Sequence, residues 1–508
     1  MSSSRTKNSA KNLISKLSVS IIMVLLGFVT RKVFVDNVGV EYLGLNGLLS
    51  NILGIMSLVE GGFATSVVYN MYKPLAEDNR PKILALLQLF RRVYIWIAIG
   101  ITILGIGLYP FIGYFMKGAN NLRYVGVVYF LFLFNSVINY FSAYKWSLIN
   151  ASQKVYKLTM INLIYQVGLS ISKLAILYFT KNYILFLVVE SLFNVAYNIA
   201  VVHKADQLFP YVKTHERYTV DNNTKSNIIT NIKALFINKL GGFFMHQTDN
   251  IIISSFVSLA ATGLFSNYTL ITGLVKSLVN QCLDSFSASV GNLIASESTE
   301  KVYAVFKTCF FVNFLLVSIP VILLFNVLTP LIDWWLGPEY RMADTVVCLI
   351  LLNFYLDCIR STALTFKTKA GIFVKDRWTP FLQGVINVVL SLLFVKKLGI
   401  TGVLLATSIS ILSIGFWQFP NLCYKYIFKK SLWNYFKHLL VYSFVFAICL
   451  FVSYSLCSTI HIRSLFMSMI VKGLITFCLT CLLYWFAFHR SEQYKDFMNY
   501  IKSLMPSY

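Results

Sequence analysis

The chain has 508 residues, of which 57% are hydrophobic and only 13% are charged. Lysine and arginine outnumber aspartate and glutamate by 44 to 20, which gives a formal net charge of +24. A soluble globular protein carries about 25% charged residues, so this composition excludes an ordinary soluble domain. The basic residues lie between apolar segments and form no single soluble patch, which argues against a nucleic-acid partner.

Long apolar runs predict an all-α, polytopic membrane protein. A helix of about 20 residues crosses the hydrocarbon core, and the apolar share of the chain suffices for about 14 crossings. A transmembrane β-barrel is excluded, because it would show alternating segments of about 10 residues instead of continuous runs. The predicted spans are residues 13–35, 43–70, 83–112, 123–149, 157–180, 183–203, 229–257, 262–292, 303–330, 345–367, 378–397, 400–424, 438–459 and 464–488.

The basic residues between the spans are distributed unequally. With the N-terminus inside, most of them fall in segments on the same side as the N-terminus. Cytoplasmic loops of membrane proteins carry an excess of lysine and arginine. We therefore predict a multi-pass protein with both termini in the cytoplasm.

The spacing of the spans suggests a duplication. A polar interruption near residues 203–227 divides them into six, six and two. Each set of six has a similar passage after its first span, in which Gly44 and Gly54 correspond to Gly263 and Gly273. Because six is even, two such halves share one orientation, with a cavity between them. We predict an N-terminal six-helix lobe at 1–205, a cytoplasmic linker at 206–228, a C-terminal six-helix lobe at 229–428, and two additional helices with a cytoplasmic tail at 429–508.

Three passages carry a resemblance to a known family. Residues 41–48 read EYLGLNGL, residues 57–64 read SLVEGGFA and residues 72–77 read YKPLAE. Here the chain resembles the bacterial polysaccharide repeat-unit (Wzx-like) flippases of the multidrug/oligosaccharidyl-lipid/polysaccharide exporter superfamily. The resemblance implies translocation of undecaprenyl-diphosphate-linked oligosaccharides across the bacterial cytoplasmic (inner) membrane. It also implies that the partners are this lipid-linked oligosaccharide and the membrane lipids.

Polar side chains inside the spans mark candidate transport residues. A charge at membrane depth costs at least about 2.5–3.5 kcal/mol, so it is retained there for a reason. The polar residues recur at helical spacing, which places each set on one helix face toward a wet cavity. These sets are Asn162, Gln166, Ser170 and Lys173; Glu190, Asn194 and Asn198; Lys276, Asn280, Asp284 and Ser287; and Asn353, Asp357 and Arg360.

Four cations are candidates for holding the diphosphate of the cargo. Arginine binds phosphate oxygens in a bidentate manner and lysine acts as a point charge. Both act more strongly in a partly dehydrated cavity than in water. The predicted substrate-binding residues are Arg31, Lys173, Lys276 and Arg360.

Each of these cations also has a purely structural interpretation. Arg360 lies one helical turn from Asp357, and Lys276 has Asp249 and Asp284 as candidate partners. Pairing of this kind lowers the cost of burying the charges. Arg31 and Lys173 lie nearer the ends of their spans, where a long side chain reaches the interface.

Three acidic residues are candidates for ion coupling. Glu60, Glu190 and Asp249 are predicted to exchange H⁺ or Na⁺ if their environments change between inward-open and outward-open states. His246 would add a titratable neighbour one turn from Asp249, or would hydrogen-bond within the bundle. The alternative is that each carboxylate balances a nearby cation or caps a helix break.

Other function classes find less support in the sequence. There is no Walker A motif through which ATP could drive transport, and no cofactor is predicted. The longest polar segment is too short for a transferase domain, so we predict that the protein is not an enzyme. The alternative within transport is a cation-coupled multidrug or small-amphiphile exporter, whose cleft should favour carboxylates over cations.

Overall fold

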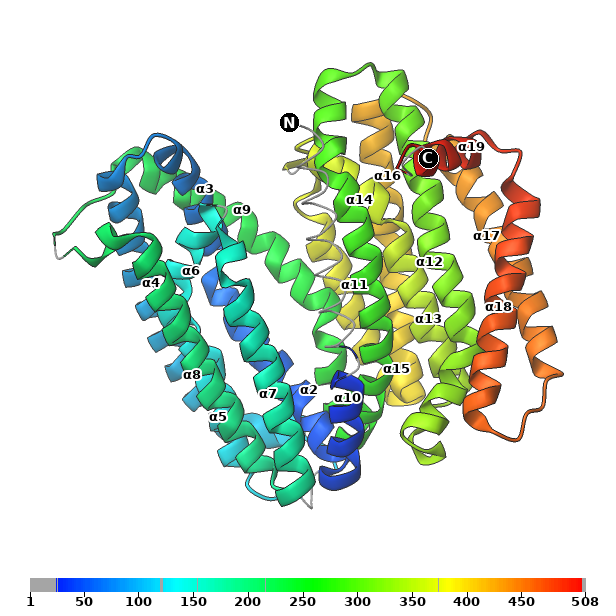
Figure 1. The fold of residues 1–508 in the computed structure, drawn as a ribbon, viewed down its shortest axis with the longest axis horizontal. Helices are drawn as coiled ribbons and strands as arrows, with labels where there is room; N and C mark the ends of the chain where they lie inside the picture. The colour runs from blue at the N-terminus through cyan, green and yellow to red at the C-terminus, as the bar shows by residue number, and fades with distance from the viewer. Residues whose placement is uncertain are drawn as a thin grey trace. The chain divides into compact units, whose positions relative to one another are not determined.

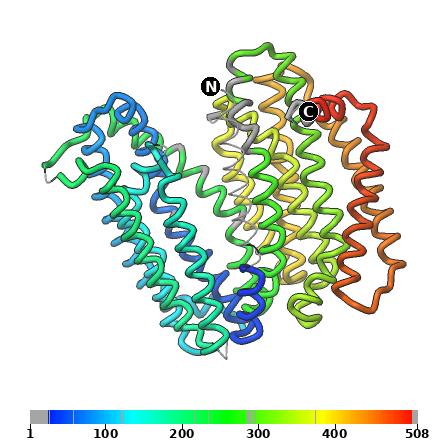
Figure 2. The backbone as a smooth tube through the Cα atoms, viewed as in Figure 1, coloured from blue at the N-terminus to red at the C-terminus, as the bar shows by residue number. Residues whose placement is uncertain are grey.

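The computed structural model is almost entirely α-helical (Figure 1, Figure 2). Ten helices in the part of the chain that it describes are long and apolar enough to cross a membrane, and that part contains no β-strand. Helices satisfy their own backbone hydrogen bonds, which lipid cannot do. The predicted fold class, an all-α polytopic membrane protein, is confirmed. The structure describes residue 24 and residues 26–118, 122–152, 154–214, 216–372 and 374–504.

Most predicted spans coincide with helices, but the span predicted at 43–70 is divided by Gly61 and Gly62, both with a left-handed backbone, into helices at Val40–Met56 and Phe63–Ala76. The helical stretch Thr379–Phe428 contains both spans predicted at 378–397 and 400–424. Gly399 separates them with a left-handed backbone, φ +58°, which glycine adopts without a Cβ penalty. The first predicted span lies partly outside the described residues, which are helical from 26 to 38.

The chain divides into two compact units. The first comprises the chain up to Phe243 together with Ser258–Gly263, and the second comprises Phe244–Val257 and the chain from Leu264 onward. The lobe and linker boundaries inferred from the sequence repeat stay a prediction.

The first unit is a helical bundle with a continuous apolar core. Its helices are α2 (Val40–Met56), α3 (Phe63–Ala76), α4 (Arg80–Leu108), α5 (Val125–Ile138), α6 (Tyr140–Ala151), α7 (Thr159–Thr180), α8 (Tyr183–Leu208) and most of α9 (Asn222–His246). Figure 1 shows α7 beside α8, and α8 also packs on α5 and α6. Leu45, Leu48 and Phe90 are fully buried in this core.

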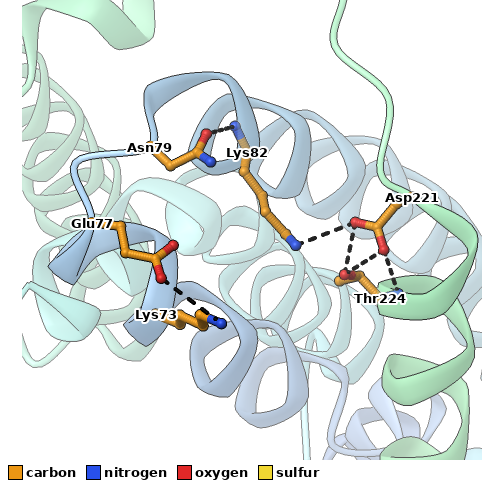
Figure 3. Close-up of polar contacts among 6 residues, drawn as sticks. All are labelled: Lys73, Glu77, Asn79, Lys82, Asp221 and Thr224. Carbon is orange, nitrogen blue, oxygen red and sulfur yellow. Dashed lines mark hydrogen bonds and ion pairs between the residues drawn. The ribbon is translucent and has the colours of Figure 1, made fainter.

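Side-chain caps fasten the start of α9 to the start of α4 (Figure 3). The Asn79 side chain accepts a hydrogen bond from the Lys82 N–H at 3.1 Å, and the Lys82 ammonium lies 3.4 Å from Asp221. Asp221 accepts hydrogen bonds from the Thr224 N–H at 2.9 Å and from its hydroxyl at 2.8 Å. These bonds and the charge of Lys82 lower the pKa of Asp221 to about 2, so the cap is ionised at physiological pH.

The first turn of α11 (Leu259–Ser296) belongs to the first unit and crosses α2 at two glycines. A Cβ on Gly44 would overlap the carbonyl of Leu259, and a Cβ on Gly263 would overlap the carbonyl of Val40. Only residues without a side chain permit backbones to approach this closely. Gly44 and Gly263, the first glycine pair of the proposed repeat, therefore lie at one helix-crossing contact.

The second unit is built around α12 (Figure 1). Its helices are α10 (Thr248–Phe256), the rest of α11, α12 (Thr299–Trp335), α13 (Asp344–Ile359), α14 (Ser361–Lys369), α15 (Thr379–Ser410), α16 (Phe416–Leu422), α17 (Trp433–Ser458), α18 (Leu465–Phe488) and α19 (Glu492–Leu504). The central helix α12 packs against α13, α17, α18 and α19. Buried aromatic side chains, including Phe306, Phe314 and Tyr442, fill the contacts of α12 with its neighbours.

We expect Gly263→Ala to destabilise the protein by about 1–3 kcal/mol, because the added methyl group must push two backbones apart. Gly100→Ala is the matched control, since a Cβ at Gly100 on α4 meets no heavy atom within 4 Å. Thermal unfolding of the two purified variants in detergent measures the difference. Equal stability of the two variants would contradict the close backbone contact.

Candidate functional site

A cavity of about 230 Å³ lies inside the second unit, among α10, α11, α13 and α15. Most of its wall is apolar, with side chains such as Phe354 and Leu404. Charge interactions are stronger in such surroundings than in water. The charged residues in the wall are Asp249 on α10, Lys276 on α11 and Asp357 on α13.

Asp357 forms ion pairs with two cations. Its Oδ2 pairs with the Lys276 ammonium, and its Oδ1 lies 2.6 Å from the Arg360 guanidinium. One carboxylate cannot neutralise two cations, so these three side chains together carry a net positive charge. The sequence pointed to Asp249 and Asp284 as partners of Lys276, but the structure pairs it with Asp357. The side chain of Asp284 lies outside the described residues.

Arg360 lies at the break between α13 and α14, with only 4% of its surface exposed. Its guanidinium also donates to Gln383 Oε1 at 3.1 Å and lies over the Phe419 ring at 5.4 Å. The Asn313 amide donates to the two carbonyls preceding Arg360, each at 3.0 Å, which satisfies backbone acceptors at the break. Arg360 does not line the cavity, whereas the Lys276 side chain is 39% exposed. The cation that faces the cavity is therefore Lys276.

Asp249 lies in the first turn of α10, just after the helix is interrupted at Gln247. The Thr407 hydroxyl donates a hydrogen bond to Asp249 Oδ2 at 3.3 Å. The same hydroxyl accepts a hydrogen bond from the Asn387 amide at 2.9 Å. Oδ1 of Asp249 and Oδ1 of Asn387 are buried and accept no hydrogen bond from the described side chains. Buried acceptors of this kind suit a proton or a small cation. The side chain of His246 lies outside the described residues.

In the first unit, two predicted polar faces meet across α7 and α8. Lys173 and Glu190 form an ion pair at 2.9 Å, and the Lys173 ammonium lies 4.4 Å from the centre of the Phe186 ring. Further along the same contact, the Tyr165 hydroxyl donates to Asn194 at 2.5 Å. The residue assigned to substrate and the residue assigned to coupling are therefore partners in one half-buried pair.

Glu60 and Arg31 occupy separate places in the first unit. Glu60 ends the short helix η1 (Ser57–Glu60), accepts a hydrogen bond from the Tyr94 hydroxyl at 2.6 Å and lies 3.8 Å from the Lys239 ammonium. Arg31 is partly exposed on the helical residues 26–38. Each unit thus contains two of the four predicted substrate-binding cations.

Sequence reasoning did not identify the polar residues of α15. Gln383 accepts a hydrogen bond from Arg360. Asn387 is hydrogen-bonded to Thr407, which is in turn hydrogen-bonded to Asp249. The available signal was the repetition of Gln383, Asn387 and Ser391 at intervals of four residues in an otherwise apolar span.

No protein-family model and no curated protein sequence matches the chain, but its fold is similar to those of several solved membrane transporters. The lipid II flippase MurJ, in an inward closed conformation, superposes with a TM-score of 0.67 and 15% identity over 94% of this chain and 100% of that chain. A MATE transporter from Vibrio cholerae superposes with a TM-score of 0.53 and 12% identity, over 84% of this chain and 99% of that chain. A MOP superfamily transporter from Pyrococcus furiosus superposes with a TM-score of 0.52 and 13% identity, over 82% of this chain and 96% of that chain. At these identities the likeness shows the fold alone.

We expect Asp357→Asn to destabilise the protein by about 3–5 kcal/mol, because it leaves two cations without their carboxylate. Glu297→Gln is the control, since Glu297 pairs with Lys301 at an exposed site and its loss should cost about 1 kcal/mol or less. Unfolding in detergent measures both, and Asp357→Asn combined with Arg360→Met should recover part of the loss. A stability equal to that of the control variant would show that Asp357 does not hold the two cations.

Proposed function

We propose that this protein is a flippase, which translocates undecaprenyl-diphosphate-linked oligosaccharide repeat units across the bacterial cytoplasmic membrane for surface polysaccharide assembly. The observation that carries the proposal is Lys276, the cation in the described wall of the cavity, whose partner Asp357 is shared with the buried Arg360. A diphosphate is the kind of ligand that such a charge attracts. The fold, which is similar to those of a lipid II flippase and of other transporters, supports a translocation role over enzymatic chemistry.

The two cations have different roles in this proposal. Lys276 is partly exposed and has a flexible stem, so its ammonium is free to exchange Asp357 for a phosphate oxygen. Arg360 is buried behind Asp357 and is a positioning residue, because it keeps the carboxylate neutralised while Lys276 turns to the cargo. Binding the cargo then requires no unpaired buried carboxylate.

The pair Lys173–Glu190 has the same potential in the first unit. Its distance of 2.9 Å and its partial exposure permit Lys173 to exchange Glu190 for an anionic ligand. Arg31 is the second cation proposed for this unit. These residues would meet the cargo at a different stage from Lys276, as rocking of one unit against the other alternates access.

Coupling to an ion is proposed to act through the charge of Asp249. Asp249 and Lys276 line the same cavity, so a proton or Na⁺ on Asp249 removes a negative charge from its wall. The wall then attracts an anionic headgroup more strongly, and by reciprocity the headgroup favours cation binding at Asp249. Glu60 and Glu190 are the further candidates, but both already contact a lysine.

The alternative function is a cation-coupled exporter of drugs or small amphiphiles. Asp249 and Asp357 are the carboxylates that an organic cation would need, and a Vibrio cholerae MATE transporter shares the fold. Pocket charge separates the two functions, and the Pyrococcus furiosus transporter is described as having a binding pocket of reverse polarity that suggests a different function. Here Asp357 is already engaged by two cations, which favours an anionic cargo.

Headgroup translocation in proteoliposomes tests the function and the role of Lys276. Wild-type protein should flip an undecaprenyl-diphosphate-linked oligosaccharide, and Lys276→Ala should slow flipping by about tenfold or more through loss of a charge-assisted contact. Lys276→Arg should retain most of the rate, and Lys301→Ala, at an exposed ion pair, should leave it unchanged. Transport of an organic cation without flipping of the glycan would overturn the proposal.

Asp249→Asn tests the coupling role, because an amide neither ionises nor binds a cation as a carboxylate does. Flipping by the wild type should respond to an imposed H⁺ or Na⁺ gradient, and flipping by Asp249→Asn should not. Glu339→Gln removes an exposed carboxylate and serves as the control. An unchanged gradient response in Asp249→Asn would remove Asp249 from the mechanism.

A further inference from the structure

A second cavity, of about 500 Å³, lies in the first unit among α4, α6 and the connector at residues 209–221, which joins α8 to α9. We name it the basic pocket after the residues that line it. Two arginines come from α4 and two further cations come from the connector. These four residues are Arg91, Arg92, Lys213 and Arg217.

Among the residues that the structure describes, the basic pocket has an excess of positive charge. None of its four cations lies within ion-pair distance of a carboxylate among the residues that the structure describes. Lys145, which also lines the pocket, is buried and paired with Asp206. In the described lining the acidic residue is Glu216, whose carboxylate accepts a hydrogen bond from the Tyr218 hydroxyl. An anionic group, such as a phosphate, fits this balance.

One end of the basic pocket is apolar and continues into the lipid-facing surface of α4. Ile95 lines the pocket one turn beyond Arg91, and it is 37% exposed. Trp96 and Ile99 follow it on α4 and are 68% and 43% exposed. Apolar residues exposed on a membrane-spanning helix face hydrocarbon. The pocket therefore lies at the boundary between water and lipid, with its cations on the aqueous side.

Hydrogen bonds hold the two walls of the basic pocket together. The Gln88 side chain of α4 donates to the carbonyl of Glu216 at 2.6 Å and accepts from the N–H of Tyr218 at 2.9 Å. The end of the connector is fastened to α4 by Lys82 and Asp221 (Figure 3). The connector that carries Lys213 and Arg217 is thus held against the helix that carries Arg91 and Arg92 before a ligand arrives, which lowers the entropic cost of binding.

We propose that the basic pocket binds the phosphate headgroup of an anionic phospholipid. The phosphate would lie between the arginines of α4 and the cations of the connector, and the acyl chains would lie along Ile95 and the exposed face beyond it. Inorganic phosphate shares the charge but has no part that fits the apolar end. The charge distribution of the sequence predicts that this end of α4 is cytoplasmic, which assigns the lipid to the cytoplasmic leaflet.

The test measures the apparent affinity of the purified full-length protein for phosphatidylglycerol, titrated in detergent and followed by thermal stabilisation. Arg91→Gln combined with Arg92→Gln should weaken binding by about tenfold or more, since each surface cation contributes about fivefold. Lys213→Gln combined with Arg217→Gln tests the opposite wall independently. The matched control, Lys225→Gln combined with Lys233→Gln, removes the same charge from exposed positions of α9 outside the pocket.

Tighter binding of phosphatidylglycerol than of phosphatidylcholine, weakened by both pocket variants but not by the control, supports the proposal. Equal binding of the two lipids would overturn it. So would an equal effect of the control variant, because diffuse surface charge would then account for the preference. Displacement of the lipid by inorganic phosphate at a similar concentration would identify a site for free anions instead.

Discussion

The cost of holding charge inside an apolar helical bundle governs the organisation of the second unit. Arg360 is almost fully buried, and Asp357 offsets its charge. Arg360 also needs the acceptor on Gln383 and the helix break that Asn313 stabilises. Since Asp357 also forms an ion pair with Lys276, the geometry of the cavity wall depends on this one carboxylate.

A shared carboxylate gives the cavity a charge that is stable and still exchangeable. If each cation had its own acid, an incoming anion would have to break a neutral pair. If neither had one, the buried guanidinium would destabilise the unit. With Asp357 between them, Lys276 could exchange its partner, as the proposed function requires, while Arg360 stays paired with Asp357. In the proposed mechanism, a proton or cation on Asp249 changes the charge of the same wall, so that cavity polarity and ion binding are linked through electrostatics.

Helical spacing in the sequence predicted the spans and the polar faces, because both depend on short-range periodicity. It found the faces that bring Lys173 to Glu190, and it placed Gly399 between two spans. It did not find the partner of Lys276, because Asp357 is 81 residues away and only tertiary packing brings them together. The helix interruption at Gln247 also escaped prediction, since no proline or glycine marks it.

The basic pocket shows how a topological signal in the sequence becomes a local structure. Arg91, Arg92, Lys213 and Arg217 count equally in the positive-inside rule, which sums charges without regard to position. The rule requires only that they lie on one side, and a dispersed arrangement would meet it equally well. Contacts made by other residues bring them together: the Gln88 amide fixes the connector against α4, and the ion pair of Asp221 with Lys82 fixes its end. Because the cations themselves repel one another, their proximity is maintained by these contacts and would be relieved by an anion between them.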